Sequence, residues 1–428
     1  MFADRLGLSA RSVYLLFGAW GGFAWALINV AWFLYYVTVA DLDPLQLVLV
    51  GTALEASYFV WEIPTGVLAD TFSRRMSVIL GTGIIYFAWI GQGLVPVFVA
   101  IAGFEILRGI GEAFTHGAIE AWVAGECGDD GLDALFLRET QLTQIAGFVG
   151  LPVGVALATI DLRIPIVLGG ALGLALAVVL VFVMPERHHP RRNEARTWRA
   201  TAGTARRGLW AVRSSALLVA LLGAEFFWGA ASEGWDRLSD AHLLLDLGFP
   251  PFGVTPVVGF GVLSLVGTIL IILTAQVVRR VVRRVDERAV SRWLVAMQVT
   301  RVACQAVFAL APWSALALAS GFLNAMLRAS FYPLFNAWLI RRTDEGVRAT
   351  VLSTTSVASA IGQVGGGPIS GTIGNGYGIP LGILSSVAML VPGTIFLARA
   401  VGLQHRTGEG GGLAASDEVP VEAGATTV

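Results

Sequence analysis

The chain has 428 residues, of which 55% are hydrophobic and only 14% are charged, with a formal net charge of −1. Soluble domains carry about 25% charged residues, so this composition excludes an ordinary soluble protein. All 29 basic residues are arginine, which excludes a phosphate-binding loop or a Schiff-base site built on lysine. Cys127 and Cys304 lack metal-ligand spacing. We therefore expect no metal, no cofactor and no nucleic-acid partner.

Turn residues and charges divide the chain into twelve apolar segments. Each is long enough to cross a bilayer as a helix, which satisfies its own backbone hydrogen bonds. The expected spans are 12–38, 44–69, 77–95, 97–124, 138–160, 164–184, 215–240, 252–277, 291–310, 313–340, 349–373 and 378–401. The predicted fold class is an all-α membrane protein with twelve transmembrane helices in a lipid bilayer.

Arginine is distributed unevenly among the loops. The loops after the second, sixth, eighth and tenth spans are rich in arginine, and the others are nearly free of it. Because arginine-rich loops stay in the cytoplasm, both termini are predicted to be cytoplasmic, and the expected location is a bacterial inner membrane. Residues 185–214 hold eight arginines and two glutamates, which predicts a basic cytoplasmic linker between six-helix bundles at 1–184 and 215–402. Residues 403–428 are glycine-rich and polar, as is typical of a disordered cytoplasmic tail.

The second half of the chain aligns with the first at an offset of 216 residues. The aligned pairs include Trp122 with Trp338, Gly150 with Gly366, Pro152 with Pro368, and Glu112 with Arg328. Such matches favour two parallel repeats related by an axis along the membrane normal, with a central site between them near the midplane.

The loop GVLADTFSRR between the second and third spans resembles the signature G-x-L-A-D-R-x-G-R-[RK] of the major facilitator superfamily. The matching residues are Gly66, Leu68, Ala69, Asp70, Arg74 and Arg75. Thr71 and Ser73 replace the arginine and the glycine of the signature. The resemblance implies the major facilitator fold and a loop that contacts the opposite half in one conformational state. Gly66, Asp70, Arg74 and Arg75 would form this conformational gate, with Asp70 near the positive N-terminal end of the eleventh helix at 348–350.

A weaker resemblance concerns the fifth span. Drug:proton antiporters of the superfamily carry G-x-x-x-G-P-x-x-G there, and here only Gly147 and Pro152 fit that pattern. The repeat partner GGGPISG in the eleventh span holds Gly367 and Pro368. The resemblance implies the exporter branch of the family. We expect Gly150, Pro152, Gly367 and Pro368 to serve close helix packing.

Ionisable side chains inside a bilayer are costly and are usually functional. In the span 97–124 they are three or four residues apart and therefore share one helix face: Glu105, Arg108, Glu112, His116 and Glu120. One interpretation is that Glu112 carries a proton while Arg108 or Arg328 tunes its proton affinity. The alternative is a permanent structural ion pair between Glu112 and Arg108. Glu105 and Glu120 are expected to be structural.

Other spans offer further charged candidates. Glu55 lies near the middle of the second span, and the seventh span contains Glu225, Glu233 and Asp236. We predict that these acids take part in coupling between protons and substrate. Arg301 in the ninth span would balance a buried carboxylate or bind an anionic substrate.

Aromatic and amide side chains suggest a substrate cavity. Asn29, Trp25, Trp32 and Trp228 would line a cavity suited to hydrophobic substrates. The alternative is that these aromatic residues serve packing or contact lipid.

Together these features predict a monomeric transporter that exports small amphipathic or drug-like molecules by proton-coupled alternating access. It would not be an enzyme, because no nucleophile elbow or metal cluster accompanies His116. One alternative is a proton-coupled symporter or facilitator for nutrient uptake. A further alternative is a non-transporting membrane receptor or enzyme on the same fold.

Overall fold

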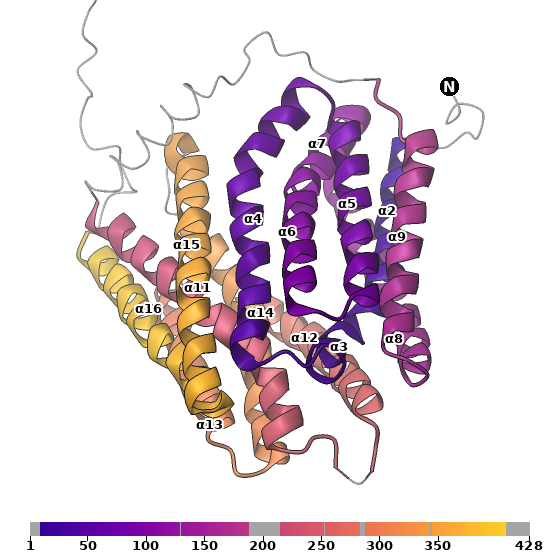
Figure 1. Ribbon diagram of the computed structural model, residues 1–428. Coiled ribbons are helices and arrows are strands. Elements are labelled where there is room, and N and C mark those ends of the chain that lie inside the picture. The colour runs from indigo at the N-terminus through magenta and orange to yellow at the C-terminus, as the bar shows by residue number, and fades with distance from the viewer. Residues whose placement is uncertain are drawn as a thin grey trace, which may run out of the picture.

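The computed structural model describes residues 9–128, 130–187, 215–251, 253–282, 287–341 and 345–407, and these are nearly all helical (Figure 1). The first half consists of α2 (Ala10–Asn29), α3 (Trp32–Thr38), α4 (Pro44–Thr71), α5 (Arg74–Leu94), α6 (Phe98–Thr115), α7 (Ala118–Cys127), α8 (Leu132–Ala158) and α9 (Arg163–Val183). The second half consists of α11 (Ala216–Ala241), the π-helical turn η1 (His242–Asp246), α12 (Pro256–Val282), α13 (Glu287–Ala309), α14 (Ser314–Ile340), α15 (Glu345–Tyr377) and α16 (Ile379–Thr407). The predicted fold class is confirmed.

Helices occupy all twelve predicted spans, with local differences. The first span is divided into α2 and α3, and the fourth is divided into α6 and α7 at Gly117, whose φ of 72° favours glycine. The fifth span begins earlier, at Leu132, and α16 continues to Thr407, beyond the predicted end of the last span. Most of the predicted linker, and the tail beyond residue 407, lie outside the described residues. The division into two bundles and a linker therefore stays a prediction.

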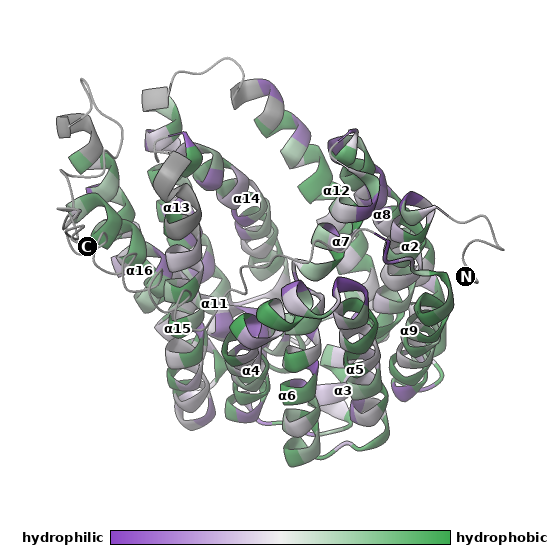
Figure 2. Ribbon diagram, turned by 90° about the horizontal axis from the view of Figure 1, so that it is seen from above, coloured by the Kyte–Doolittle hydropathy of each residue, from purple (hydrophilic) through white to green (hydrophobic). Residues whose placement is uncertain are grey.

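Eight helical segments in the described part of the chain are long and apolar enough to cross a membrane. Figure 2 shows hydrophobic residues along most of the helices. Helix α6 is not among the eight, because it carries Glu105, Arg108 and Glu112 within its 18 residues. This helix is therefore stable in a bilayer only if those charges face protein or water.

Side-chain caps begin the helices beside the short loops. Asp43 Oδ1 accepts from the Gln46 amide at 2.8 Å, and Gln46 Oε1 accepts from the Asp43 amide at 3.2 Å. This reciprocal capping box, followed by Pro44 in the first turn, starts α4. Ser73 caps α5 by accepting from the Met76 amide at 2.9 Å. Ser73, which replaces the glycine of the family signature, thus serves as the N-cap of α5.

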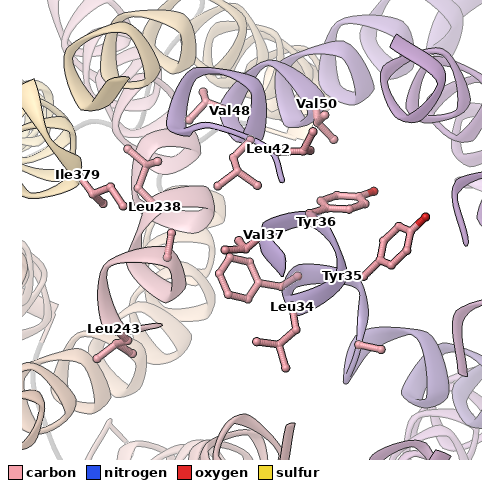
Figure 3. Packing of buried hydrophobic residues seen from close by; sticks show 14 of the residues in the cluster. Leu34, Tyr35, Tyr36, Val37, Leu42, Val48, Val50, Leu238, Leu243 and Ile379 are labelled. Carbon is pink, nitrogen blue, oxygen red and sulfur yellow. The ribbon is translucent and has the colours of Figure 1, made fainter. Parts of the chain in front are cut away.

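Three buried apolar clusters show how the halves are joined. At the end that carries the arginine-rich loops after α4, α9 and α14, called here the arginine-rich face, each half has its own cluster. Tyr14 and Trp122 belong to the cluster of the first half, and Leu294 and Phe335 to that of the second. At the opposite face one cluster takes residues from both halves, including Leu34, Tyr35, Tyr36, Val48, Leu238, Leu243 and Ile379 (Figure 3). We call this shared cluster the seam.

Helix α4 packs against the second half near its start and is exposed near its end. Near its start it packs against α15, where a Cβ added at Gly371 would lie 3.1 Å from Val48 Cβ and 3.2 Å from Leu45 Cα. Small residues at such positions let two helices approach closely. Near the end of α4 the apolar side chains of Val60 and Phe72 are 64% and 77% exposed. Among the side chains that the structure describes, the close contacts between α4 and α15 lie towards the beginning of α4, at the opposite face.

Candidate functional site

A cavity of about 370 Å³ lies among α2, α4, α6 and α7 of the first half. Its lining residues are Phe17, Glu55, Tyr58, Glu112, Thr115, His116, Ile119 and Glu120. Glu112 keeps 37% of its side chain exposed, so solvent reaches it. Glu112, His116 and Glu120 all line this cavity, although the expected continuous helix is broken at Gly117 and Glu120 lies on α7. The cavity thus combines three carboxyl groups with aromatic and apolar surface.

Arg108 links two acids of the same helix. Its Nε and Nη2 donate to Glu105 Oε2 at 2.9 Å and 2.7 Å, and its Nη1 donates to Glu112. Glu105 is only 1% exposed, whereas Glu112 faces the cavity. Arg108 therefore connects a buried acid to a solvent-accessible one. From the sequence, Glu112 could either carry a proton or form a structural ion pair with Arg108. The observed geometry is compatible with both interpretations.

Glu55 stands opposite this network on α4. It lines the same cavity, and among the described residues it has no hydrogen bond or ion pair within bonding distance. Tyr58, one turn further along α4, packs edge-on against His116 with ring centroids 5.8 Å apart. The Arg108 guanidinium contacts the carboxyl groups of Glu105 and Glu112, and Glu55 lines the cavity beside Glu112 without contacting the guanidinium. These three acids outnumber the one arginine of the network.

The second half forms its own ion pairs. Arg237 Nε lies 3.5 Å from Glu233 Oε2 along α11. Arg328 of α14 holds Asp236 with both terminal nitrogens, one of them at 2.9 Å from Oδ2. The proposed tuning of Glu112 by Arg328 is not found in this conformation, because each residue pairs within its own half. Equivalent positions in two repeats are related by symmetry and need not be in contact.

The described residues contain no group of three or more His, Cys, Asp or Glu side chains that could hold a metal ion. What the geometry provides is a set of charged pairs on both sides of the seam and an acidic cavity on one side.

The model of the Major Facilitator Superfamily matches residues 14–289, well over half of the chain. The chain belongs to the major facilitator superfamily. It is 22% identical over 392 residues to the uncharacterized MFS-type transporter YxaM of Bacillus subtilis (strain 168), covering 89% of this chain and 94% of YxaM. This is a family of transporters rather than of enzymes.

Solved structures confirm the major facilitator fold. The nucleoside transporter NupG is 14% identical, with a TM-score of 0.71, over 92% of this chain and 99% of NupG. A bacterial homologue of the human lysosomal transporter Spinster, in an inward-facing and unoccupied conformation, is 15% identical, with a TM-score of 0.71, over 93% of this chain and 97% of that chain. At such identities the likeness shows the fold alone.

The signature loop of this superfamily member is tied to its own half. Arg74 lies 3.3 Å from Asp70 and donates to the Ala121 carbonyl at 2.8 Å. Glu186, after α9, accepts from the Ser73 hydroxyl at 2.7 Å and from the Arg75 amide at 3.3 Å. A Cβ at Gly66 would meet no atom within 4 Å. The side chains at 348–350, the expected partners of Asp70, lie outside those described, so the gate stays a prediction.

Removing the Glu186 carboxylate is expected to loosen this loop. Glu186→Ala takes the acceptor from Ser73 and from the Arg75 amide, and hydrogen bonds to a charged group contribute about 1.5–3 kcal/mol each when well shielded. We expect a loss of about 1–3 kcal/mol, measured as a lower Tm of the detergent-purified protein. Arg138→Ala, at an exposed position of α8, serves as the control. A Tm equal to that of the control would contradict the bracing role of Glu186.

Among the predicted cavity residues, Asn29 and Trp32 are neighbours in the first half, whereas Trp228 is buried in the second half. Asn29 is exposed and its Oδ1 accepts from Trp32 Nε1 at 3.3 Å, and Trp32 also faces the Arg237 guanidinium at 5.5 Å. Trp25 is 43% exposed and packs against Trp89. Trp228 does not line a cavity: it is 2% exposed within the cluster of the second half. Aromatic spacing along the sequence could not separate this packing role from a lining role.

Glu225 of the same half is also deeply placed. It is 8% exposed and has no hydrogen-bond or ion-pair partner among the described residues. No cation among the described residues pairs with Glu225, so its role in coupling stays a prediction.

The packing residues lie where helices come close. A Cβ on Gly150 would lie 2.9 Å from Ala26 Cβ, and one on Gly367 would lie 2.9 Å from Thr52 Oγ1. Pro152 and Pro368 lie inside α8 and α15. Gly150 thus faces α2 within the first half, whereas Gly367 faces α4 across the seam.

Sequence reasoning missed the groups that surround Arg108. Tyr36 donates to Glu105 Oε1 at 3.0 Å and to Gln92 Oε1. The Trp89 ring lies 5.1 Å from the Arg108 guanidinium. The buried amide of Gln92 in an apolar span was the one signal available, since polar side chains in a membrane need partners.

Proposed function

We propose that this protein is a proton-coupled secondary transporter that moves small amphipathic molecules by alternating access. The observation that carries the proposal is the uneven joining of the halves. They share a core at the opposite face and have separate cores at the arginine-rich face. With the arginine-rich face in the cytoplasm, as the positive-inside rule predicts, this conformation is inward-facing. Both termini then lie in the cytoplasm of a bacterial cell.

Alternating access requires a second arrangement of the same halves. The seam would open, and the exposed part of α4 would dock against the second half. In this state the signature loop would reach the start of α15. Protons and substrate drive such a change only if they bind the two states with different affinity.

The acidic cavity supports the proton-coupling part of the proposal. Glu55 has no ion-pair partner within bonding distance in the described part of the chain, and Glu112 shares Arg108 with the buried Glu105. Because Glu55 and Glu112 line one cavity and only Glu112 contacts Arg108, uptake of one proton would relieve the repulsion between these two carboxyl groups. We assign proton carriage to Glu55 and Glu112 together, with Arg108 holding the pair of charges on α6.

The lining of the cavity supports an amphipathic substrate. Phe17 and Ile119 present apolar surface, and Tyr58 presents an aromatic ring with a polar tip. The other lining residues are polar or ionisable, so a molecule bound here would need polar groups beside its apolar part. We propose export as the direction, in line with the glycine–proline pattern of the fifth span, and a monomer as the working unit. Uptake of a nutrient with a proton is the alternative.

Proteoliposomes loaded with a pH-sensitive dye test proton coupling. For any compound that the wild type transports, we expect substrate-driven proton movement to fall at least about 10-fold in Glu112→Gln and in Glu55→Gln, since general proton carriers contribute effects of that order or larger. Asp133→Asn, an exposed acid at the start of α8, should behave like the wild type.

Two outcomes would contradict this proposal. Undiminished proton movement in both variants would exclude Glu55 and Glu112 as carriers. Transport of every substrate without proton movement in the wild type would indicate a facilitator. The sign of the proton movement relative to that of the substrate separates antiport from symport.

A further inference from the structure

Arg301 of α13 is a buried cation on the second half. It is 5% exposed. Its Nη1 donates to Gln298 Oε1 at 2.7 Å, and its Nε donates to Asn324 Oδ1 of α14 at 3.3 Å. Gln305 Nε2 shares the same Asn324 oxygen at 3.4 Å. All four side chains are at most 5% exposed, so a guanidinium is held rigidly among neutral amides.

No carboxylate neutralises this guanidinium. Among the described residues none lies within ion-pair distance of Arg301. The ionisable groups that act on it electrostatically are Tyr332, Arg328 and Asp236. Asp236 is already held by both terminal nitrogens of Arg328. Two arginines therefore share one acid, and the region has an excess of positive charge.

An uncompensated buried charge is expensive, costing several kcal/mol even after the protein relaxes. Proteins keep such groups where they are used. The amides around Arg301 accept its hydrogen bonds but supply no negative charge. This points to a counter-ion that arrives with a ligand.

Unused polar atoms surround the same point. Gln298 Nε2 and Gln305 Oε1 are buried without a hydrogen-bond partner, although buried polar atoms in proteins are nearly always paired. The free Gln298 amide donor lies beside the guanidinium. Together they offer N–H groups to one oxyanion, and a planar guanidinium matches a carboxylate well.

The site lies next to the space between the halves. Asn324 and Arg328 are one turn apart on α14, and Arg328 and Asp236 keep 33% and 37% of their side chains exposed. Because Asn324 holds Arg301 one turn away from Arg328 on α14, a ligand would approach Arg301 past this exposed pair. The acidic cavity on the first half carries the opposite excess of charge.

We propose that Arg301, together with the Gln298 amide, binds a carboxylate group of the transported molecule. This inference rests on the proposed transport function and narrows its substrate class to amphipathic molecules that carry a carboxylate. Arg328 and Asp236 form the exposed approach to the site. Asn324 and Gln305 hold the guanidinium in place.

The test compares each carboxylic acid with its own amide. The full-length protein in detergent is heated with 4-phenylbutyrate, decanoate, indole-3-acetate or N-acetylphenylalanine, and separately with the corresponding carboxamide. We expect at least one acid to raise Tm in the wild type by mass action, whereas its amide does not. The apparent affinity should fall at least about 10-fold in Arg301→Gln and remain unchanged in Arg292→Gln. Arg292 lies exposed on the same helix.

Gln298→Leu is the second variant, which keeps the charge and removes the amide. It should weaken the acid-specific shift by about 3- to 10-fold, the loss of one hydrogen bond. The inference is overturned if acids and amides shift Tm equally, if no acid in the panel shifts it, or if both variants retain the shift. A shift produced fully by chloride would also overturn it, since the counter-ion is then inorganic.

This measurement uses no ion gradient. If proton coupling is not observed in proteoliposomes, the Tm measurement still shows whether Arg301 binds a carboxylate. Loss of the acid-specific shift in Arg301→Gln likewise leaves the roles of Glu55 and Glu112 untouched.

Discussion

Arg108→Leu is expected to lower the free energy of unfolding by about 3–5 kcal/mol, the cost of removing one partner from a buried ion pair. The change leaves Glu105, which is 1% exposed, without its cation. Tyr36 and Gln92 cannot supply a positive charge. The measurement is Tm and denaturant midpoint of the detergent-purified protein.

Two further variants separate charge burial from packing. Glu112→Gln removes the solvent-accessible partner of Arg108 and should change Tm little. Adding Glu105→Gln to Arg108→Leu removes the stranded carboxylate and should recover most of the loss, because neutral replacements of a buried pair are often tolerated. If the single variant Arg108→Leu is as stable as the wild type, the network does not hold α6 in place.

Gly371→Val is expected to open the seam. The added Cβ would lie 3.1 Å from Val48 Cβ and 3.2 Å from Leu45 Cα, before the two methyl groups of valine are placed. Overpacking typically costs about 1–3 kcal/mol. Because the strain exists only while α15 and α4 are docked, it would shift the conformational equilibrium away from the conformation described here by roughly 5- to 150-fold.

Spin labels on the opposite face measure this shift. Labels at Thr38 and Gly376, both exposed, report the separation of the halves in a background that lacks Cys127 and Cys304. Gly365→Val, on the same helix at a position with no neighbour within 4 Å, is the control. An unchanged distance distribution in Gly371→Val would mean that the seam does not close this state.

Much of the fold could be predicted from the sequence because apolar length alone identifies membrane helices. The interruption at Gly117 could not be predicted in this way, since the turn with a φ of 72° lies within one continuous predicted span. Glu112, His116 and Glu120 line one cavity although the helix is interrupted between them, so their shared wall depends on the turn at Gly117 as well as on their spacing. Residue spacing predicts which side chains share a face only within one continuous helix.

Contacts between helices were the part that sequence could not supply. Glu112 and Arg328 occupy equivalent repeat positions, yet each pairs inside its own half. Trp228 was expected at a cavity and is buried, because helix rotation decides which face an aromatic side chain presents. Tyr36 joined the Arg108 network from another helix for the same reason.

The placement of α4 has a consequence for leakage. It is one continuous helix of 28 residues, about 42 Å long at 1.5 Å per residue. Its beginning is docked on α15 while the apolar side chains near its end are exposed. Pro64 removes one backbone hydrogen bond between these two parts, but the chain stays helical through it, so the two ends of α4 move as one element. Under the proposed mechanism, closing one side and opening the other is therefore a single movement, and a continuous pore that would drain the proton gradient never forms.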